Sequence, residues 1–222
     1  MTGISVIIPT LNAARTLPAT VSAIGGGVEI IVVDGGSQDA TVECAERLGA
    51  RVIAAERGRG AQLIAGANAA RGPWLLFLHA DTALEAHWRA ETRAFISDAG
   101  HAAMAAVFRF ALDEPSAWAR RLEKMVAWRG RALSLPYGDQ GLLIHKDFYR
   151  ALGGFSAEPL MEDVDIVRRI GCARLRILES AAFTSAAKWR RDGWLKRSLR
   201  NLFCLTLYFA GVPPRVLVRL YG

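Results

Sequence analysis

Two apolar runs in the first half of the chain each end at an acidic residue. The run Trp74–Leu78 leads to His79 and Asp81, and the run 28–33 leads to Asp34. A lone carboxylate after so apolar a run needs a partner, and a divalent cation that bridges phosphates is a natural one. We therefore expect Asp81 to hold Mg²⁺ or Mn²⁺. His79 lies on the same side of an extended chain, as a second ligand or as a hydrogen-bonding neighbour.

Glycines surround other polar residues that suit a nucleotide. Asp34 precedes two glycines, which let the backbone approach a flat or anionic ligand closely. Its carboxylate either accepts from a base N–H or caps the next helix in an Asx turn. Arg57 and Arg59 stand among glycines before a helical stretch. Guanidinium groups and a helix N-terminus favour a diphosphate there, and a solvated surface loop is the alternative.

Three acids crowd into four residues of the second half, at Glu162, Asp163 and Asp165. Neighbouring like charges raise carboxylate pKa values toward those of a general base, so we expect one of these acids to be catalytic. The alternative is the acidic first turn of a helix, which the helix dipole stabilises. Both interpretations hold together if Asp163 points into a cleft and Asp165 points outward.

The elements that would position these residues begin as repeated strand, loop and helix units. Apolar periodicity predicts strands at 4–9, 28–33, 51–55 and 74–78, and helices at 13–24, up to 48, and at 61–70. Right-handed crossovers between such units give a parallel sheet. Its edge would bring together Pro9, Asp34, Arg57 and Asp81.

The second half is less regular. We predict helices at 85–99, 115–131 and within 159–170, and strands at 103–112 and 139–145. The helix at 115–131 is amphipathic, and we expect one of its faces to pack on the sheet. That face comprises Trp118, Leu122, Met125, Val126 and Arg129.

The C-terminal tail carries the whole charge excess. The chain has 222 residues and a formal charge of +7, yet eight Lys or Arg and one acid, Asp192, lie from Lys188 onward. We divide the chain into a domain at 1–187 and a helical tail at 188–222, with Asp192 capping a helix at 193–209. The tail is a membrane-surface helix, a homodimer helix or a core-packing helix. A nucleic-acid partner is not expected, because the basic residues do not spread over a face.

Composition and termini also suggest a compartment. Three widely spaced cysteines without a CxxC pair suggest reduced thiols. The first apolar run begins at Ile4 without a basic leader, so no signal peptide is visible. We expect a cytoplasmic protein that is peripheral at the inner face of the membrane if the tail binds lipid.

Five stretches together resemble the family 2 glycosyltransferases of the GT-A fold, and they follow one another in the order of that family. The length and tail also resemble the arsenosugar-biosynthesis-type subgroup. The resemblance implies an α/β fold with a Rossmann-like, mostly parallel sheet flanked by helices. The stretches are ISVIIPTLNA at 4–13, IIVVDGGSQDAT at 30–41, RGRGAQLIAGANAARGPWLLFLHADT at 57–82, GLLIHKDFYRALGGF at 141–155 and LMEDVDIVRRI at 160–170.

The resemblance also implies roles for single residues. It puts Pro9, Asp34 and Arg57 in the nucleotide pocket, with Asp34 on the uracil of a UDP-sugar. It gives Asp81 the metal, although the family usually has an aspartate where this chain has His79. Asp163 matches the catalytic base. The sequence Trp189–Arg191 corresponds to a basic aromatic motif that contacts phosphate or acceptor.

The reaction implied is an inverting sugar transfer to an acceptor hydroxyl, with Asp163 as base and a cation on the departing diphosphate. A nucleotidyltransferase is one alternative, although the segment 9–15 lacks the glycine-rich, lysine-containing loop such enzymes usually have. An inactive membrane-surface or protein-binding module on the same fold is the other, motivated by His79 and the basic tail.

Overall fold

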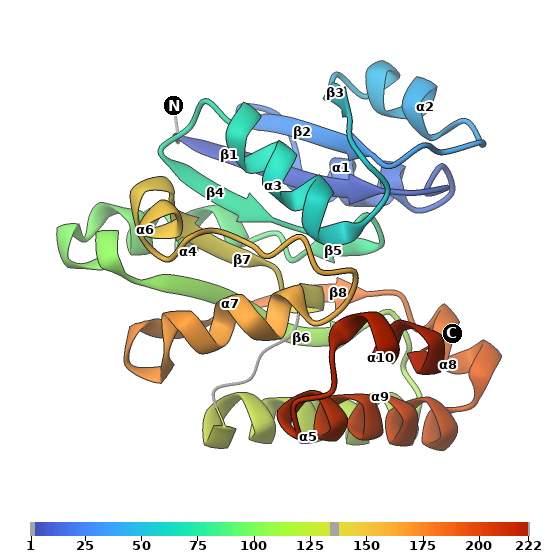
Figure 1. The fold of residues 1–222 in the computed structure, drawn as a ribbon. Coiled ribbons are helices and arrows are strands. Elements are labelled where there is room, and N and C mark those ends of the chain that lie inside the picture. Colours follow the sequence, from blue (N-terminus) through green and yellow to red (C-terminus); the bar gives the residue numbers. More distant parts are fainter. Residues whose placement is uncertain (1–2, 134–137, 222) are drawn as a thin grey trace.

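The computed structural model describes residues 3–133 and 138–221. Within them, eight strands form one sheet in the order β3-β2-β1-β4-β7-β6-β8-β5 (Figure 1). The first four in this order are parallel, as predicted. They are β3 (Arg51–Ala54), β2 (Glu29–Asp34), β1 (Ile4–Thr10) and β4 (Trp74–Phe77).

The other half of the sheet is mixed, in keeping with the less regular second half of the sequence. Strand β7 is antiparallel to β4 and β6, and β5 is antiparallel to β8, whereas β6 and β8 are parallel. These strands are β5 (Thr82–Leu84), β6 (Ala105–Leu112), β7 (Leu142–His145) and β8 (Leu175–Thr184). The strand predicted from Asp139 was wrong at its start, because residues Gly138–Gln140 form a 3₁₀ turn and Gly141 has a φ of 65°.

Helices cover both faces of the sheet because buried strands carry apolar side chains on both sides. Val6 and Ile8 face one core with Leu17, whereas Ile7 faces the other with Leu63. The helices are α1 (Leu17–Ile24), α2 (Thr41–Arg47), α3 (Arg59–Ala69), α4 (Trp88–Ser97), α5 (Ala117–Leu133), α6 (Lys146–Ala151), α7 (Glu162–Ile170), α8 (Ala187–Asp192), α9 (Trp194–Phe209) and α10 (Pro214–Tyr221). Helix α1 begins later than predicted, because residues 13–16 form a turn ahead of it.

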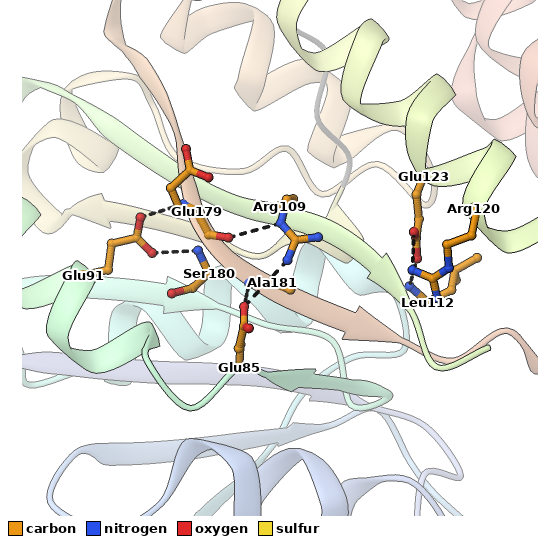
Figure 2. A network of polar contacts seen from close by, with 9 residues as sticks. All are labelled: Glu85, Glu91, Arg109, Leu112, Arg120, Glu123, Glu179, Ser180 and Ala181. Atoms are coloured by element: carbon orange, nitrogen blue, oxygen red, sulfur yellow. Dashed lines mark hydrogen bonds and ion pairs between the residues drawn. The ribbon is translucent and has the colours of Figure 1, made fainter. Parts of the chain in front are cut away.

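Carboxylates fix β8 to the segment that carries the metal candidate. An irregularity in the pairing of β6 and β8 leaves backbone N–H groups of β8 without strand partners. The carboxylate of Glu91 accepts from the N–H groups of Glu179 and Ser180, and Glu85 accepts from Ala181 (Figure 2). These bonds hold β5 on β8, directly after Asp81.

The tail packs on the rest of the chain. Trp189 lies in a core cluster with Phe110 and Val126, and α9 and α10 pack on α7 through Cys204 and Leu217. Asp192 does not cap α9: the cap is Gly193, and Asp192 accepts from three arginines instead (Arg191, Arg197 and Arg200). No helix within 3–133 and 138–221 is long and apolar enough to cross a membrane.

Helix α5 uses part of its predicted packing face: Leu122 and Val126 pack on the core beside β6. Ala119 and Val126 are buried against β6, but Trp118, Met125 and Trp128 are at least half exposed. Ala119 joins this packed face, whereas the predicted residues Trp118 and Met125 lie outside it. Helices α5 and α9 both lie at the end of the molecule away from β1–β4 (Figure 1).

Candidate active site

Asp34 joins the loops that follow β1 and β2. Its Oδ1 accepts from the hydroxyls of Thr10 (3.1 Å) and Ser37 (2.5 Å), and its Oδ2 accepts from the N–H groups of Gly36 (3.0 Å) and Ser37 (2.8 Å). The bond from Gly36 closes an Asx turn, so the structure contains the turn that was one of the two interpretations of this residue. Asn12 extends the same network by donating its N–H to the Ser37 hydroxyl.

These contacts settle the charge of Asp34. Burial alone would raise its pKa, but the hydrogen bonds from Ser37, Gly36 and Thr10 outweigh burial and lower the pKa below its usual value. The carboxylate therefore stays ionised. A carboxylate has about four acceptor sites, and four donors already use them. A base N–H would have to share an oxygen with one of these donors.

The other predicted nucleotide residues lie around this loop network. Pro9 lies inside β1 and pairs with Val33 of β2. Proline has no N–H to donate, and the sheet tolerates it here because the pairing of β1 with β4 ends earlier, at Ile7 and Phe77. Arg57 is exposed on the loop between β3 and α3. Gln62 of α3 ties the edge together because its Nε2 donates to the carbonyl oxygens of Thr10 and Val33.

Arg59 and Glu162 form an ion pair. The Arg59 Nε donates to Glu162 Oε1, and the Glu162 side chain is only 1% exposed. Burial raises the pKa of Glu162, although the Arg59 charge opposes this. The Glu162 carboxylate thus holds Arg59 at the start of α3, and a catalytic role for Glu162 stays a prediction. It also restrains Arg59, which was expected to be available to a diphosphate.

The remaining acids of this cluster point different ways. Asp165 pairs with Arg169 one turn later on α7. Asp163 lies in the first turn of α7 and lines a cavity. Met161, just before the helix, has a left-handed φ of 66°, which is uncommon for a non-glycine residue and directs the chain into α7 at this point.

Asp81 and His79 follow β4, as expected. The Asp81 Oδ2 lies 3.7 Å from the Nζ of Lys188, so the tail contacts the site directly. Burial, aided by the charge of Arg59, lowers the pKa of His79 to about 4. The imidazole is therefore neutral near pH 7, which is the form that ligates metals.

These groups open into one cavity of about 490 Å³. Arg59, His79, Asp81, Asp163 and Lys188 line it, together with side chains of α5 and α9. Pro9, Asp34 and Arg57 are not among the described residues that line it. The cavity therefore lies beside the predicted nucleotide pocket.

Asp139 is a cavity residue that sequence reasoning missed, since its surroundings predict only a buried strand. Burial, together with the nearby carboxylates of Asp163 and Asp81, raises the pKa of Asp139 to about 6, although Arg129 opposes the shift. Its Oδ1 is shielded from solvent and accepts no hydrogen bond in the described part of the chain. One feature of the sequence could have indicated Asp139: it is an acid two residues before Gly141, where an apolar run begins.

The donor set suits a cation that takes part of its ligands from elsewhere. Carboxylate oxygen is the ligand that Mg²⁺ and Mn²⁺ prefer, and Asp81 supplies one. Neutral His79 lies in the same cavity. The residues described here contain no group of three or more His, Cys, Asp or Glu placed to hold a metal. Phosphate oxygens would have to complete such a site.

The residues of the predicted basic aromatic motif, Trp189–Arg191, do not all contact the cavity. Trp189 is buried and lines the cavity, while Arg190 pairs with Glu114 and Arg191 with Asp192. Lys188, one residue before the motif, is the cation that reaches Asp81. The structure therefore brings Lys188 and Trp189 to the site and engages both arginines outside it.

Comparison with known proteins gives a family. Residues 5–175 match the model described as glycosyl transferase family 2. A PGL/p-HBAD biosynthesis glycosyltransferase of Mycobacterium tuberculosis is 42% identical over 106 residues, which cover 42% of this chain and 41% of that protein. An uncharacterized glycosyltransferase of Mycobacterium bovis is 38% identical over 84 residues, covering 37% and 38%. The chain thus spans about two fifths of the length of these curated relatives.

Solved structures share the fold at low identity. A mannosyltransferase from Pyrobaculum calidifontis in complex with GDP-Man and Mn²⁺ has a TM-score of 0.66 at 18% identity, covering 89% of this chain and 59% of that one. Glucosyl-3-phosphoglycerate synthase from Mycobacterium tuberculosis, in complex with Mn²⁺, UDP and glucosyl-3-phosphoglycerate, has a TM-score of 0.64 at 18% identity, covering 95% and 80%. The predicted GT-A fold with its helical tail is confirmed.

Proposed function

The chain belongs to glycosyl transferase family 2, and we propose that it transfers a sugar from a UDP-sugar to an acceptor hydroxyl with inversion at the anomeric carbon. One observation carries the proposal. Asp163 in the first turn of α7 and Asp81 in the segment between β4 and β5 line the same cavity. A base and a diphosphate-binding group are what such a transfer needs on the two sides of one carbon.

In the proposed reaction Asp163 is the general base. The acceptor oxygen forms a bond to the anomeric carbon while the bond from that carbon to the β-phosphate oxygen breaks. The hydroxyl proton passes to the Asp163 carboxylate, and the bonding electrons leave with UDP. Positive groups beside the departing oxygen stabilise this charge, and Lys188 is placed for that role beside Asp81.

A divalent cation would be held by Asp81, with His79 as its neighbour, and by the diphosphate. When bound, it neutralises charge on the leaving group. Support comes from the ligand chemistry of the two side chains and from similar structures that contain Mn²⁺. Because the protein supplies few ligands, cation affinity should be poor without a nucleotide.

The donor assignment rests on the loops around Asp34. Their preformed network suits a flat base or a diphosphate, and two similar structures contain UDP or UDP-GlcNAc. We assign Pro9, Asp34, Arg57 and Arg59 to this side. The relation to the arsenosugar-biosynthesis-type subgroup stays a prediction.

The location and partners are proposals too. The tail exposes apolar side chains on α9 and α10 and carries the charge excess, which suits a cytoplasmic protein at the inner face of the membrane. A homodimer through the same tail is the other proposal. The family match favours sugar transfer over nucleotidyl transfer. The inactive-module alternative would leave Asp163 in the cavity without a task.

A thermal-shift panel tests the proposal. UDP-, GDP- and TDP-sugars are each added with and without Mn²⁺, because a ligand at about 100 times its Kd stabilises the folded state by roughly 2.7 kcal/mol. For a chain of this size that corresponds to a rise in Tm of about 5–10 °C. We expect the rise with a UDP-sugar and Mn²⁺ together. No rise with any nucleotide sugar would refute the proposal, and a rise with a nucleoside triphosphate that releases pyrophosphate would favour the nucleotidyltransferase.

A further inference from the structure

Apolar side chains of two helices make up much of the lining of the cavity that contains Asp163. From α5 it receives Leu122, Met125 and Trp128, and from α9 it receives Leu195, Leu199 and Leu202. The α9 leucines are spaced at i, i+4 and i+7, so they form one stripe along the helix. Arg129 of α5 and Arg197, Ser198 and Asn201 of α9 line the cavity as well, so the apolar side chains form most but not all of what the two helices contribute.

These side chains are not buried by the chain itself. Met125 is 50% exposed, Trp128 64%, Leu195 64%, Leu199 55% and Leu202 59%. Exposed apolar side chains that gather in one concave place mark a binding site more often than single exposed leucines do. Their exposure shows that the fold alone does not provide the apolar contacts that these side chains can make.

The apolar side chains and the candidate catalytic groups share one cavity. Asp163, Asp139 and Asp81 line it together with the leucine stripe of α9. Among the described lining residues, α5 and α9 contribute no carboxylate. A ligand that fills the cavity can therefore meet carboxylates and cations such as Arg59 and Lys188 with its polar part, and the exposed leucines with hydrocarbon.

Size limits what this ligand can be. A volume of about 490 Å³ lies within the range of roughly 300–1,000 Å³ that is typical of small-molecule sites. The predicted nucleotide residues Pro9, Asp34 and Arg57 lie outside the described lining, so the volume does not belong to the base end of the donor. The cavity fits the second substrate.

We infer that the acceptor is a small amphiphile: a hydroxyl-bearing head at Asp163 and an apolar chain along α5 and α9. The inference rests on the proposed sugar transfer and narrows its acceptor class. A purely polar acceptor would leave the leucine stripe in contact with water. An amphiphile removes the stripe from water, and each methylene it buries contributes to affinity.

The test is calorimetric binding of butyl, hexyl and octyl β-D-glucoside to the full chain, each below its critical micelle concentration. These probes keep one hydroxyl head and vary only the chain. We expect affinity to rise about two- to fourfold per methylene. An affinity that does not depend on chain length overturns the inference.

Two matched variants on α9 test where the alkyl chain of the glucoside binds. Leu202→Ser changes a cavity residue, and Phe203→Ser changes its neighbour, which is 56% exposed and is not among the described lining residues. We expect Leu202→Ser to weaken octyl glucoside by about tenfold, which corresponds to about 1.4 kcal/mol, and Phe203→Ser to change it less than about twofold. Equal losses in both variants would overturn the inference.

Two further measurements distinguish acceptor binding from nucleotide binding and from membrane docking. UDP with Mn²⁺ is titrated into the same samples. If UDP does not bind but glucoside affinity still rises with alkyl chain length, the result counts against sugar transfer and not against an amphiphilic ligand. Sedimentation with anionic phospholipid vesicles is measured as well. If both variants lose vesicle binding equally while the glucoside series is flat, the leucine stripe docks on a membrane and the acceptor inference is wrong.

Discussion

The two ends of the site differ in how complete they are. At the proposed nucleotide end, both oxygens of Asp34 accept hydrogen bonds from loops that the fold already holds together. At the proposed acceptor end, the Oδ1 of Asp139 is shielded from solvent and accepts no hydrogen bond from the described residues. Apolar side chains such as Leu202 remain exposed there.

From this difference we infer that the two proposed substrates bind in different ways. The parallel half of the sheet builds a preorganised loop network, and preorganisation lowers the entropic cost of binding. The mixed half, with α5 and α9, leaves surface for a ligand to cover. We therefore expect changes at the nucleotide end to cost stability and affinity together, and changes at the acceptor end to separate them.

The largest effect should follow Asp163→Asn. Removing a general base costs about 10²–10⁴-fold in rate. We expect kcat to fall by this factor while calorimetric affinity for UDP with Mn²⁺ stays within about twofold. Asp165→Asn is the matched control, because Asp165 lies on the same helix and pairs with Arg169. Unchanged turnover in Asp163→Asn would remove Asp163 from its role.

The next largest effect should follow Asp34→Ala. Donors from Thr10, Gly36 and Ser37 would lose their acceptor, and each buried unsatisfied group costs about 1–3 kcal/mol. We expect a loss of about 2–3 kcal/mol in the free energy of unfolding, measured with urea, and weaker UDP binding.

Asp98→Ala is the control for that change. Asp98 also accepts from a backbone N–H two residues on, that of Gly100, but its side chain is largely exposed. It should cost less than about 1 kcal/mol, since water replaces the lost acceptor. If the two variants lose equal stability, the nucleotide end is not the preorganised one.

A smaller effect of opposite sign should follow Asp139→Asn. In the folded state the pKa of Asp139 is raised to about 6, above the value of 3.8 for the free group. The folded state therefore binds the proton more tightly, and wild-type stability falls as pH rises from about 4 to 6. The variant lacks this titration. Its free energy of unfolding should therefore exceed that of wild type by about 1–2 kcal/mol at pH 7.5 and differ little from it at pH 4. Urea unfolding at both pH values checks this, and a pH-independent difference would contradict it.

The smallest effect should follow Lys188→Met. The Lys188–Asp81 pair spans 3.7 Å and is partly exposed, and such pairs contribute at most about 1 kcal/mol to stability. We expect the Tm without ligand to change by less than about 4 °C. Donor affinity should fall more, because Lys188 faces the proposed diphosphate. A large loss of Tm with unchanged donor affinity would make Lys188 a structural residue only.

The sequence predicted the strands around Asp34 better than the contacts around the cavity, for physical reasons. Strands β1 to β4 are apolar runs that end in polar turns, and local patterns of that kind are decisive. The Arg59–Glu162 pair joins residues 103 positions apart, which no local pattern reveals. Asp192 was expected to cap a helix, but three arginines brought near by α9 compete for its carboxylate. Likewise, the periodicity of α5 shows that the helix is amphipathic, but it does not show which apolar side chains the sheet covers. Trp118 and Met125 were therefore predicted to be packed and are exposed.

The most direct test of the proposed site is a calorimetric titration of Mn²⁺ into the free protein and into the protein saturated with UDP. Since the described residues contain no three-ligand cluster, the diphosphate must complete the coordination. We predict weak binding to the free protein and an affinity at least about tenfold higher with UDP, which is within the usual range of coupling between sites. Tight binding of Mn²⁺ to the free protein, unchanged by UDP, would contradict the proposed site.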